Sequence, residues 1–163
     1  MKTQTYIYNP EFKVFLKFWL SISLLMLLLA TILYLIVNDG EPFQAHLRSN
    51  WPILFVLPLI NSIIHAYGAR KHVFSLTDTD DPTHVANWAL ELLQKNGMNV
   101  KSENQNKTVL APTKGIPKWF GNKFGTELVT VESAADKIVI TGKYKYIDII
   151  DTKLKFGQVA FKH

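Results

Sequence analysis

The sequence predicts a membrane-anchored α+β protein, in which a two-helix transmembrane hairpin is followed by a small two-layer domain. Residues 18–38 and 49–69 are runs of 21 residues without a Lys, Arg, Asp or Glu. As a helix, such a run rises roughly 31 Å, which matches the hydrocarbon thickness of a bilayer. From residue 82 onward, a helical pattern of apolar residues is followed by four short runs typical of strands.

The first run, residues 18–38, predicts a retained transmembrane helix and not a cleaved signal peptide. A signal core typically has about 7 to 15 apolar residues and ends in a cleavage site of small residues. This run is longer, and the residues that follow it, Asn38-Asp39-Gly40-Glu41-Pro42, contain no such site.

Charges beside the two spans predict their orientation. Three lysines precede the first span and Arg70-Lys71 follow the second, whereas the connecting loop holds one basic residue and two acids. Because basic residues stay on the cytoplasmic side, we expect both termini in the cytoplasm. The layout resembles that of bacterial membrane proteins, so we predict an integral protein of a bacterial cytoplasmic membrane. The predicted parts are a cytoplasmic segment 1–17, spans 18–38 and 51–69 joined by the external loop 39–50, a linker 70–81 and a cytoplasmic α+β domain 82–163.

The second span is the more polar of the two. Pro58 lies within it, and Asn61, Ser62 and His65 share one helix face. Ser23 of the first span lies at a depth similar to that of His65. We expect Ser23, Asn61, Ser62 and His65 to pack the two helices together or to contact another membrane protein. The alternative is a proton relay through His65, although the spans hold no acid to serve it.

A helix opens the soluble domain. Asp81 is a suitable N-cap, Pro82 fits the first helical position, and apolar residues recur at helical spacing from Val85 to Leu93. Asn96-Gly97 is a typical helix end. The apolar stripe predicts a sheet beneath this helix.

Four mostly antiparallel strands and a C-terminal helix complete the predicted domain. Helical spacing of Ile147, Ile150 and Leu154 favours a helix over residues 143–156, although aromatic residues that alternate with lysines there leave a strand as the alternative. The helices and sheet would form two layers. The predicted strands are Met98–Glu103, Thr108–Ala111, Thr126–Glu132 and Lys137–Thr141.

Composition and motifs argue against several classes of function. Residues 72–163 hold twelve lysines and ten acids, a balance that gives no reason to expect nucleic acid as a partner. The chain has no cysteine, which excludes a disulfide, a thiolate metal site and a thiol nucleophile. The sequence contains no glycine-rich phosphate loop, hydrolase elbow or zinc-protease motif. We therefore predict no enzymatic activity and no cofactor.

One acidic cluster, Asp78, Asp80, Asp81 and His84, resembles a metal site in composition. Acids also favour the start of a helix, and the glycine and glutamate of an EF-hand loop are missing here. We predict a helix start and no metal. As an alternative, Asp78, Asp80 and His84 joined by another acid would make the protein an enzyme that acts on lipid-linked substrates.

The most distinctive soluble segment is residues 114–125, where three lysines alternate with aromatic and aliphatic residues and no acid occurs. Such a segment can bind an anionic leaflet, because the rings enter the interface and each lysine adds about 1 kcal/mol. Alternatively, Trp119 and Phe120 pack under the sheet. The candidate residues for contact with lipid or a partner are Lys114, Lys118, Trp119, Phe120, Lys123 and Phe124.

Taken together, these features predict a non-enzymatic accessory or scaffold protein that presents a small cytoplasmic domain to a membrane complex. Its expected partners are the lipid bilayer and either another membrane protein or a second copy of the chain. The alternative function is a membrane-proximal sensor or binding module for anionic lipid or a small ligand.

Overall fold

The computed structural model describes residues 2–37, 40–79, 81–115, 118 and 122–156. The chain forms two compact units. One is a helical hairpin, Pro10–Gly68, and the other joins Met1–Asn9 to Ala69–His163.

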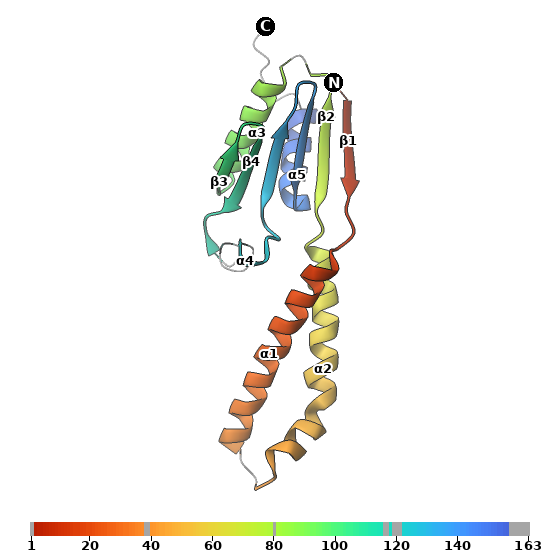
Figure 1. Cartoon of the computed structure of the whole chain (residues 1–163), viewed down its shortest axis with the longest axis vertical. Coiled ribbons are helices and arrows are strands. Elements are labelled where there is room, and N and C mark those ends of the chain that lie inside the picture. The colour runs from red at the N-terminus through yellow and green to blue at the C-terminus, as the bar shows by residue number, and fades with distance from the viewer. Residues whose placement is uncertain (1, 38–39, 80, 116–117, 119–121, 157–163) are drawn as a thin grey trace. The chain divides into compact units, whose positions relative to one another are not determined.

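The hairpin consists of α1 (Phe12–Val37) and α2 (Phe43–Gly68), which run antiparallel beside each other (Figure 1). Both helices begin earlier than the predicted spans, which started at residues 18 and 51. By length and composition, α1 and the Trp51–Gly68 part of α2 can each cross a membrane. Proline within α2, at Pro52 and Pro58, leaves the helix continuous.

The other unit is built on a six-stranded antiparallel sheet with the order β1-β2-β6-β5-β4-β3. The last four strands in the chain confirm the four predicted strands, with ends that differ by up to three residues. The strands are β1 (Lys2–Ile7), β2 (His72–Thr77), β3 (Met98–Asn104), β4 (Lys107–Pro112), β5 (Val129–Ser133) and β6 (Lys137–Gly142).

Strands β1 and β2 were not predicted, because their residues fell in the N-terminal segment and in the linker. They pair with each other, with Thr5 opposite Phe74 and Ile7 opposite His72. The backbone N–H of Tyr8 extends this pairing by donating to the carbonyl of Lys71 at 2.9 Å. The helical hairpin is therefore inserted between two neighbouring strands of one sheet.

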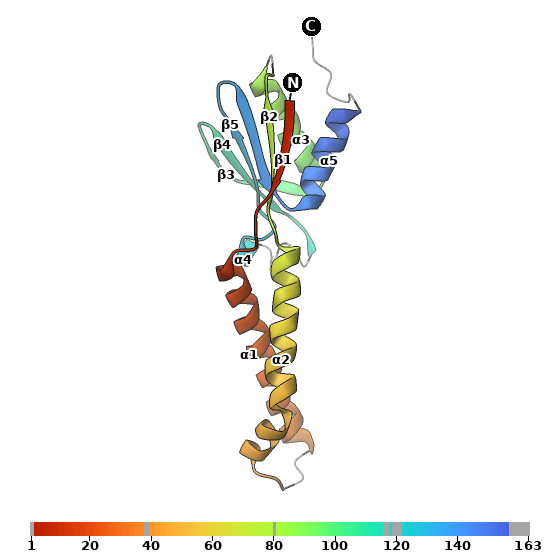
Figure 2. The same cartoon turned by 90° about the vertical axis from the view of Figure 1, so that its right-hand side faces the viewer.

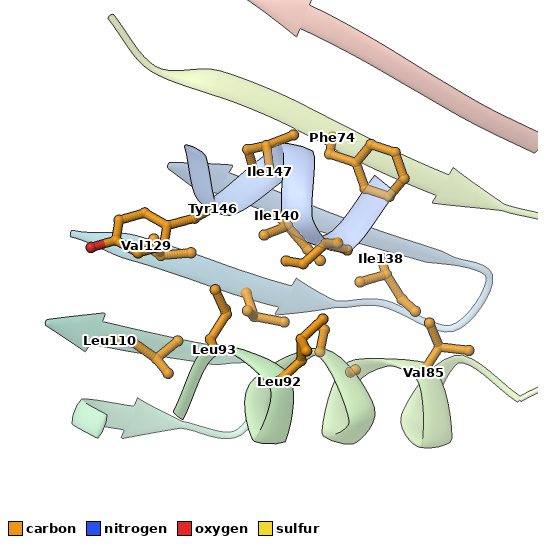
Figure 3. Packing of buried hydrophobic residues seen from close by; sticks show 14 of the residues in the cluster. Phe74, Val85, Leu92, Leu93, Leu110, Val129, Ile138, Ile140, Tyr146 and Ile147 are labelled. Carbon is orange, nitrogen blue, oxygen red and sulfur yellow. The ribbon is translucent and has the colours of Figure 1, made fainter. Parts of the chain in front are cut away.

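Two helices, α3 (Pro82–Lys95) and α5 (Tyr144–Lys155), cover one face of the sheet and leave the other face open (Figures 1 and 2). Helix α5 confirms the prediction for the C-terminal segment. Between the layers lie side chains such as Phe74 of β2, Ile140 of β6 and Leu93 of α3, each fully buried (Figure 3). Burial of such a side chain stabilises the fold by about 1.5–3 kcal/mol.

Because β1 pairs with β2, two cysteines introduced at opposed positions of these strands should form a disulfide. The natural chain has no cysteine that could interfere. Directly opposed residues of antiparallel strands have Cα atoms about 4.5–5.5 Å apart, which suits a disulfide. Gln4 lies opposite Ser75, so the Gln4→Cys/Ser75→Cys variant should form one on oxidation. Cyanogen bromide cleaves at Met26 and Met98, and mass spectrometry should then find fragment 2–26 joined to fragment 27–98.

The matched control is Gln4→Cys/Thr130→Cys, because Thr130 lies on β5, which is not a neighbour of β1. It should leave fragments 2–26 and 99–163 separate. Separate fragments in the Gln4→Cys/Ser75→Cys variant, or equal cross-linking in both variants, would contradict the observed strand order.

Candidate functional site

Both connections between the sheet and the hairpin leave from one edge of the sheet, which we call the tether edge. Ile7, at the end of β1, lies opposite His72, at the start of β2, and His72 lies opposite Gly142, at the end of β6. The registers of the other strands bring the start of β3, the end of β4 and the start of β5 to the same edge. The described residues of the segment 113–128, which joins β4 to β5, therefore lie at this edge as well.

Basic residues gather at the tether edge. Among the described side chains of the α+β unit, the strand ends, connecting segments and helix ends there hold seven basic residues and one acid, whereas those at the opposite edge hold five lysines and five acids. The tether-edge residues are Arg70, Lys71, Lys95, Lys114, Lys118, Lys143, Lys145 and the acid Glu127. Those at the opposite edge are Lys2, Lys107, Lys137, Lys153, Lys155, Asp78, Asp81, Glu103, Glu132 and Asp136.

Glu127 is the buried acid of this edge, with an exposed fraction of 7%. Its Oε1 accepts a hydrogen bond from Lys143, and its Oε2 lies 3.0 Å from Nζ of Lys145. Lys145 also lies over the ring of Tyr146, 4.6 Å from the centroid. Because Glu127 precedes β5 and the two lysines open α5, the cluster joins the end of segment 113–128 to the start of this helix.

The environment of this cluster shifts the pKa values of Glu127 and Lys145. Burial alone would raise the pKa of Glu127, but hydrogen bonds and the charges of Lys143 and Lys145 outweigh burial and hold it below the ordinary 4.5. Burial would lower the pKa of Lys145, but its hydrogen bond to Glu127 leaves that pKa raised. Glu127 and Lys145 are therefore both ionised at neutral pH.

Exposed aromatic and apolar side chains lie among these charges. Tyr144, at the start of α5, is 60% exposed, and its ring centroid lies 5.2 Å from that of His72. The Tyr144 hydroxyl donates to Asp148 at 3.1 Å, which raises the pKa of this phenol. Ile7 and Tyr8, at the end of β1, are also exposed. The tether edge thus combines cations with side chains that suit a membrane interface.

The candidate residues of segment 114–125 are only partly described. Lys114 and Lys118 are exposed, and Phe124 is half-buried within the short helix α4 (Asn122–Phe124). The backbone of Lys123 belongs to α4, but its side chain is not described. Trp119 and Phe120 lie outside the described residues, so their contact with lipid or a partner stays a prediction.

Polar residues of the spans find partners within the hairpin itself. Asn61 donates to the carbonyl of Leu57 at 2.9 Å, and Ser62 donates to the carbonyl of Pro58 at 2.5 Å. The ring of His65 stacks on that of Phe18, with centroids 5.3 Å apart. Ser23 is half-buried on α1. A contact of these four residues with another membrane protein stays a prediction.

Among the buried residues of the two helices, Ser62 was a predicted packing residue, whereas Ala30, Pro58 and Ala66 were not. Pro58, Ser62 and Ala66 are buried on α2, and Ala30 is buried on α1. The three α2 residues are four apart, a spacing of small side chains that lets transmembrane helices approach closely. This spacing was the signal that could have identified them.

The acidic cluster before α3 has structural roles in the described residues. Asp81 caps the helix, because its Oδ1 accepts from the backbone N–H of His84 at 2.9 Å. Asp78 pairs with Lys2 at 3.4 Å, and Asp80 lies outside the described residues. In the described part of the chain, no three His, Asp or Glu residues are grouped so that they could hold a metal.

A polar cleft of about 330 Å³ lies at the opposite edge of the sheet, beside the first half of α3. Half of its lining residues carry amide or hydroxyl side chains, and none of the predicted site residues contributes to it. The amide and hydroxyl residues of this lining are Thr83, Asn87, Asn104, Gln105, Asn106, Thr108 and Ser133.

No protein-family model matches this chain, and comparisons with curated proteins and with solved structures find no significant similarity.

Replacement of the buried acid should destabilise the domain. Glu127→Gln keeps the shape of the side chain but removes the charge that holds Lys143 and Lys145, so unfolding should cost about 1–3 kcal/mol less at pH 7. Because folding lowers the pKa of Glu127, its stabilisation is complete above the unfolded value of 4.5 and is lost as pH falls through the folded pKa. Urea unfolding of the full chain in detergent, followed by circular dichroism between pH 3 and 8, measures both effects.

Glu132→Gln is the matched control. It breaks an ion pair with Lys107 whose two side chains are about half exposed, so its effect should stay within about 0.5 kcal/mol. Equal effects of the two substitutions, or a Glu127→Gln effect that does not shrink at low pH, would contradict this role of Glu127.

Proposed function

We propose that this protein is a non-enzymatic accessory or scaffold protein of a bacterial cytoplasmic membrane. Its hairpin crosses the bilayer twice, and its α+β domain stays on the cytoplasmic side, where it binds another membrane protein. The observation that carries this proposal is the insertion of the hairpin between the paired strands β1 and β2.

The exposed apolar side chains of the hairpin support its insertion into a membrane. Large apolar side chains remain exposed along both helices, as with Leu24 at 68%, Ile36 at 74% and Ile64 at 62%. A continuous apolar surface of this extent favours aggregation in water, whereas lipid tails accept it. The core helices of a soluble protein would instead be covered by other elements.

The position of strand β1 supports the view that α1 remains in the protein and is not cleaved off as a signal sequence. It precedes α1 in the chain and pairs with β2, which follows the whole hairpin. Removal of α1 as a signal sequence would also remove β1 from the sheet. Pairing thus supports a permanent membrane helix.

The same pairing supports a hairpin whose two ends lie on one side of the membrane. Lys13 and Lys17 lie near the start of α1, and Arg70 and Lys71 follow α2, which favours the cytoplasmic side. The two connections, residues 8–11 and 69–71, span at most about 3.6 Å per residue. They therefore keep the domain at the membrane surface.

The open face of the sheet supports a protein partner. One row of register partners crosses all six strands on this face, and it holds no charged residue. Small uncharged side chains cost little to remove from water, and the cores of protein interfaces are poor in charged residues. The row consists of Tyr6, Val73, Thr141, Thr130, Val109 and Ser102.

Photo-crosslinking in the native membrane tests the proposed function. A benzoylphenylalanine at Val109 should cross-link the full chain to one membrane protein or to a second copy, and the same species should co-purify in mild detergent. Thr130→Lys puts a charge beside Val109 on the open face and should remove this species, while the amount of inserted protein stays the same.

Asp136→Lys, in the exposed turn between β5 and β6, is the matched control and should keep the cross-link. A chain that purifies alone and gives no cross-link from the open face would overturn the accessory role. Equal loss of the cross-link in the Thr130→Lys and Asp136→Lys variants would also overturn this role.

A further inference from the structure

We propose that the tether edge binds anionic phospholipid head groups and so holds the α+β domain against the cytoplasmic leaflet. This inference rests on the membrane anchoring of the proposed function, but it needs no protein partner. Its occupant is the lipid surface itself, argued from the distribution of charge, the position of the tethers and the side chains exposed between the cations.

Charge is distributed unevenly along the strands of the sheet, with an excess of basic residues at the tether edge. Within the α+β unit, the described side chains of the tether edge include seven basic residues and one acid, whereas lysines and acids are equal in number at the opposite edge. The cytoplasmic leaflet has a negative surface potential that attracts basic residues within about one Debye length. This field therefore favours the orientation with the tether edge toward the lipid.

The acid of the tether edge is kept away from that surface. The Glu127 side chain is only 9% exposed, and its two oxygens face Lys143 and Lys145. Those two lysines together carry one more charge than Glu127 neutralises, and half of the Lys145 side chain remains exposed. The cluster thus fixes two lysines at the edge without presenting a carboxylate to anionic lipid.

Side chains suited to the interface lie between the cations. Tyr8 is 62% exposed, Tyr144 is 60% exposed, and each carries a hydroxyl on an apolar ring. Tyrosine is enriched at membrane interfaces because the ring can enter the boundary while the hydroxyl stays wet. Lys114 and Lys118 are exposed at the same edge. Cations and tyrosines together match a phospholipid head group above acyl chains.

Proximity favours the leaflet over other polyanions. Both connections to the hairpin leave from this edge, and they are four and three residues long. A bilayer that holds the hairpin therefore stays within reach of the tether edge throughout. A nucleic acid or an acidic protein would have to enter this space from solution.

A single fluorescent probe on the full chain tests the proposal, because the chain has no natural cysteine. Tyr144→Cys labelled with NBD reports the tether edge, and Asp136→Cys reports the opposite edge. The chain is placed in nanodiscs of phosphatidylcholine alone or with about 30% phosphatidylglycerol. Doxyl-labelled lipids should quench the probe at position 144 at least about fivefold more strongly with the anionic lipid, and about 0.5 M NaCl should reverse this. The probe at position 136 should not respond.

Matched charge reversals locate the surface. Lys114→Glu/Lys118→Glu removes two exposed cations from the tether edge and should lower the ratio of lipid-bound to free domain by at least about 25-fold, at about fivefold for each lysine. Lys101→Glu/Lys137→Glu makes the same charge change on β3 and β6, away from this edge, and should leave the ratio within about twofold.

Lipid binding by the tether edge would be overturned if the probe at position 144 were quenched equally in the two lipid mixtures. Equal effects of the two double variants would overturn it as well. Neither result would contradict the anchoring of the hairpin in the membrane. An alkaline carbonate wash separates the two proposals. If it strips the chain from membranes, the anchoring itself is wrong, and lipid binding by the tether edge is overturned with it.

Discussion

Pairing of β1 with β2 is the constraint on which the rest of the structure depends. The two strands are separated in the chain by the whole helical hairpin, yet Ile7 lies opposite His72 in the sheet. Their backbone hydrogen bonds bring both ends of the hairpin to one edge of one sheet. If the hairpin crosses a membrane, this pairing requires that it return to the side from which it entered. The sheet thereby holds the two ends of the hairpin together, and both ends join the sheet at its tether edge.

Each remaining surface of the α+β unit has a distinct character that follows from this arrangement. Helices α3 and α5 bury one face of the sheet, as the fully buried Phe74, Leu93 and Ile140 show. The opposite face is open and carries a charge-free row of side chains across all six strands. At the tether edge, Glu127 binds two lysines and so joins segment 113–128 to α5. The proposed protein partner on the open face and the proposed lipid contact at the tether edge would therefore use different surfaces.

Local patterns predicted the elements that depend on local chemistry. Absence of charge indicated the two long helices, Asp81-Pro82 indicated the start of α3, a polar turn between two short runs indicated β3 and β4, and alternation indicated β5 and β6. Strand β1 escaped prediction because all six of its residues are exposed, so its sequence has no buried face to show as alternation. Its pairing with β2 is a non-local contact that no window of sequence contains. The pairing of Glu127 with Lys143 likewise joins residues 16 apart that only the fold brings together. Ser62 was expected to serve helix packing, and the structure adds the small residues Pro58 and Ala66 on the same face.

The most direct test of a membrane hairpin inserted between β1 and β2 is to determine from which side of the membrane introduced cysteines can be labelled. Thr3→Cys on β1, Ser102→Cys on β3 and Glu41→Cys in the loop between the helices are three exposed positions in a chain without natural cysteine. A membrane-impermeant maleimide should label the Thr3→Cys and Ser102→Cys variants in inverted vesicles alone and the Glu41→Cys variant in right-side-out vesicles alone. Labelling of positions 3 and 102 from opposite sides of the membrane would contradict the pairing of β1 with β2 around a membrane hairpin.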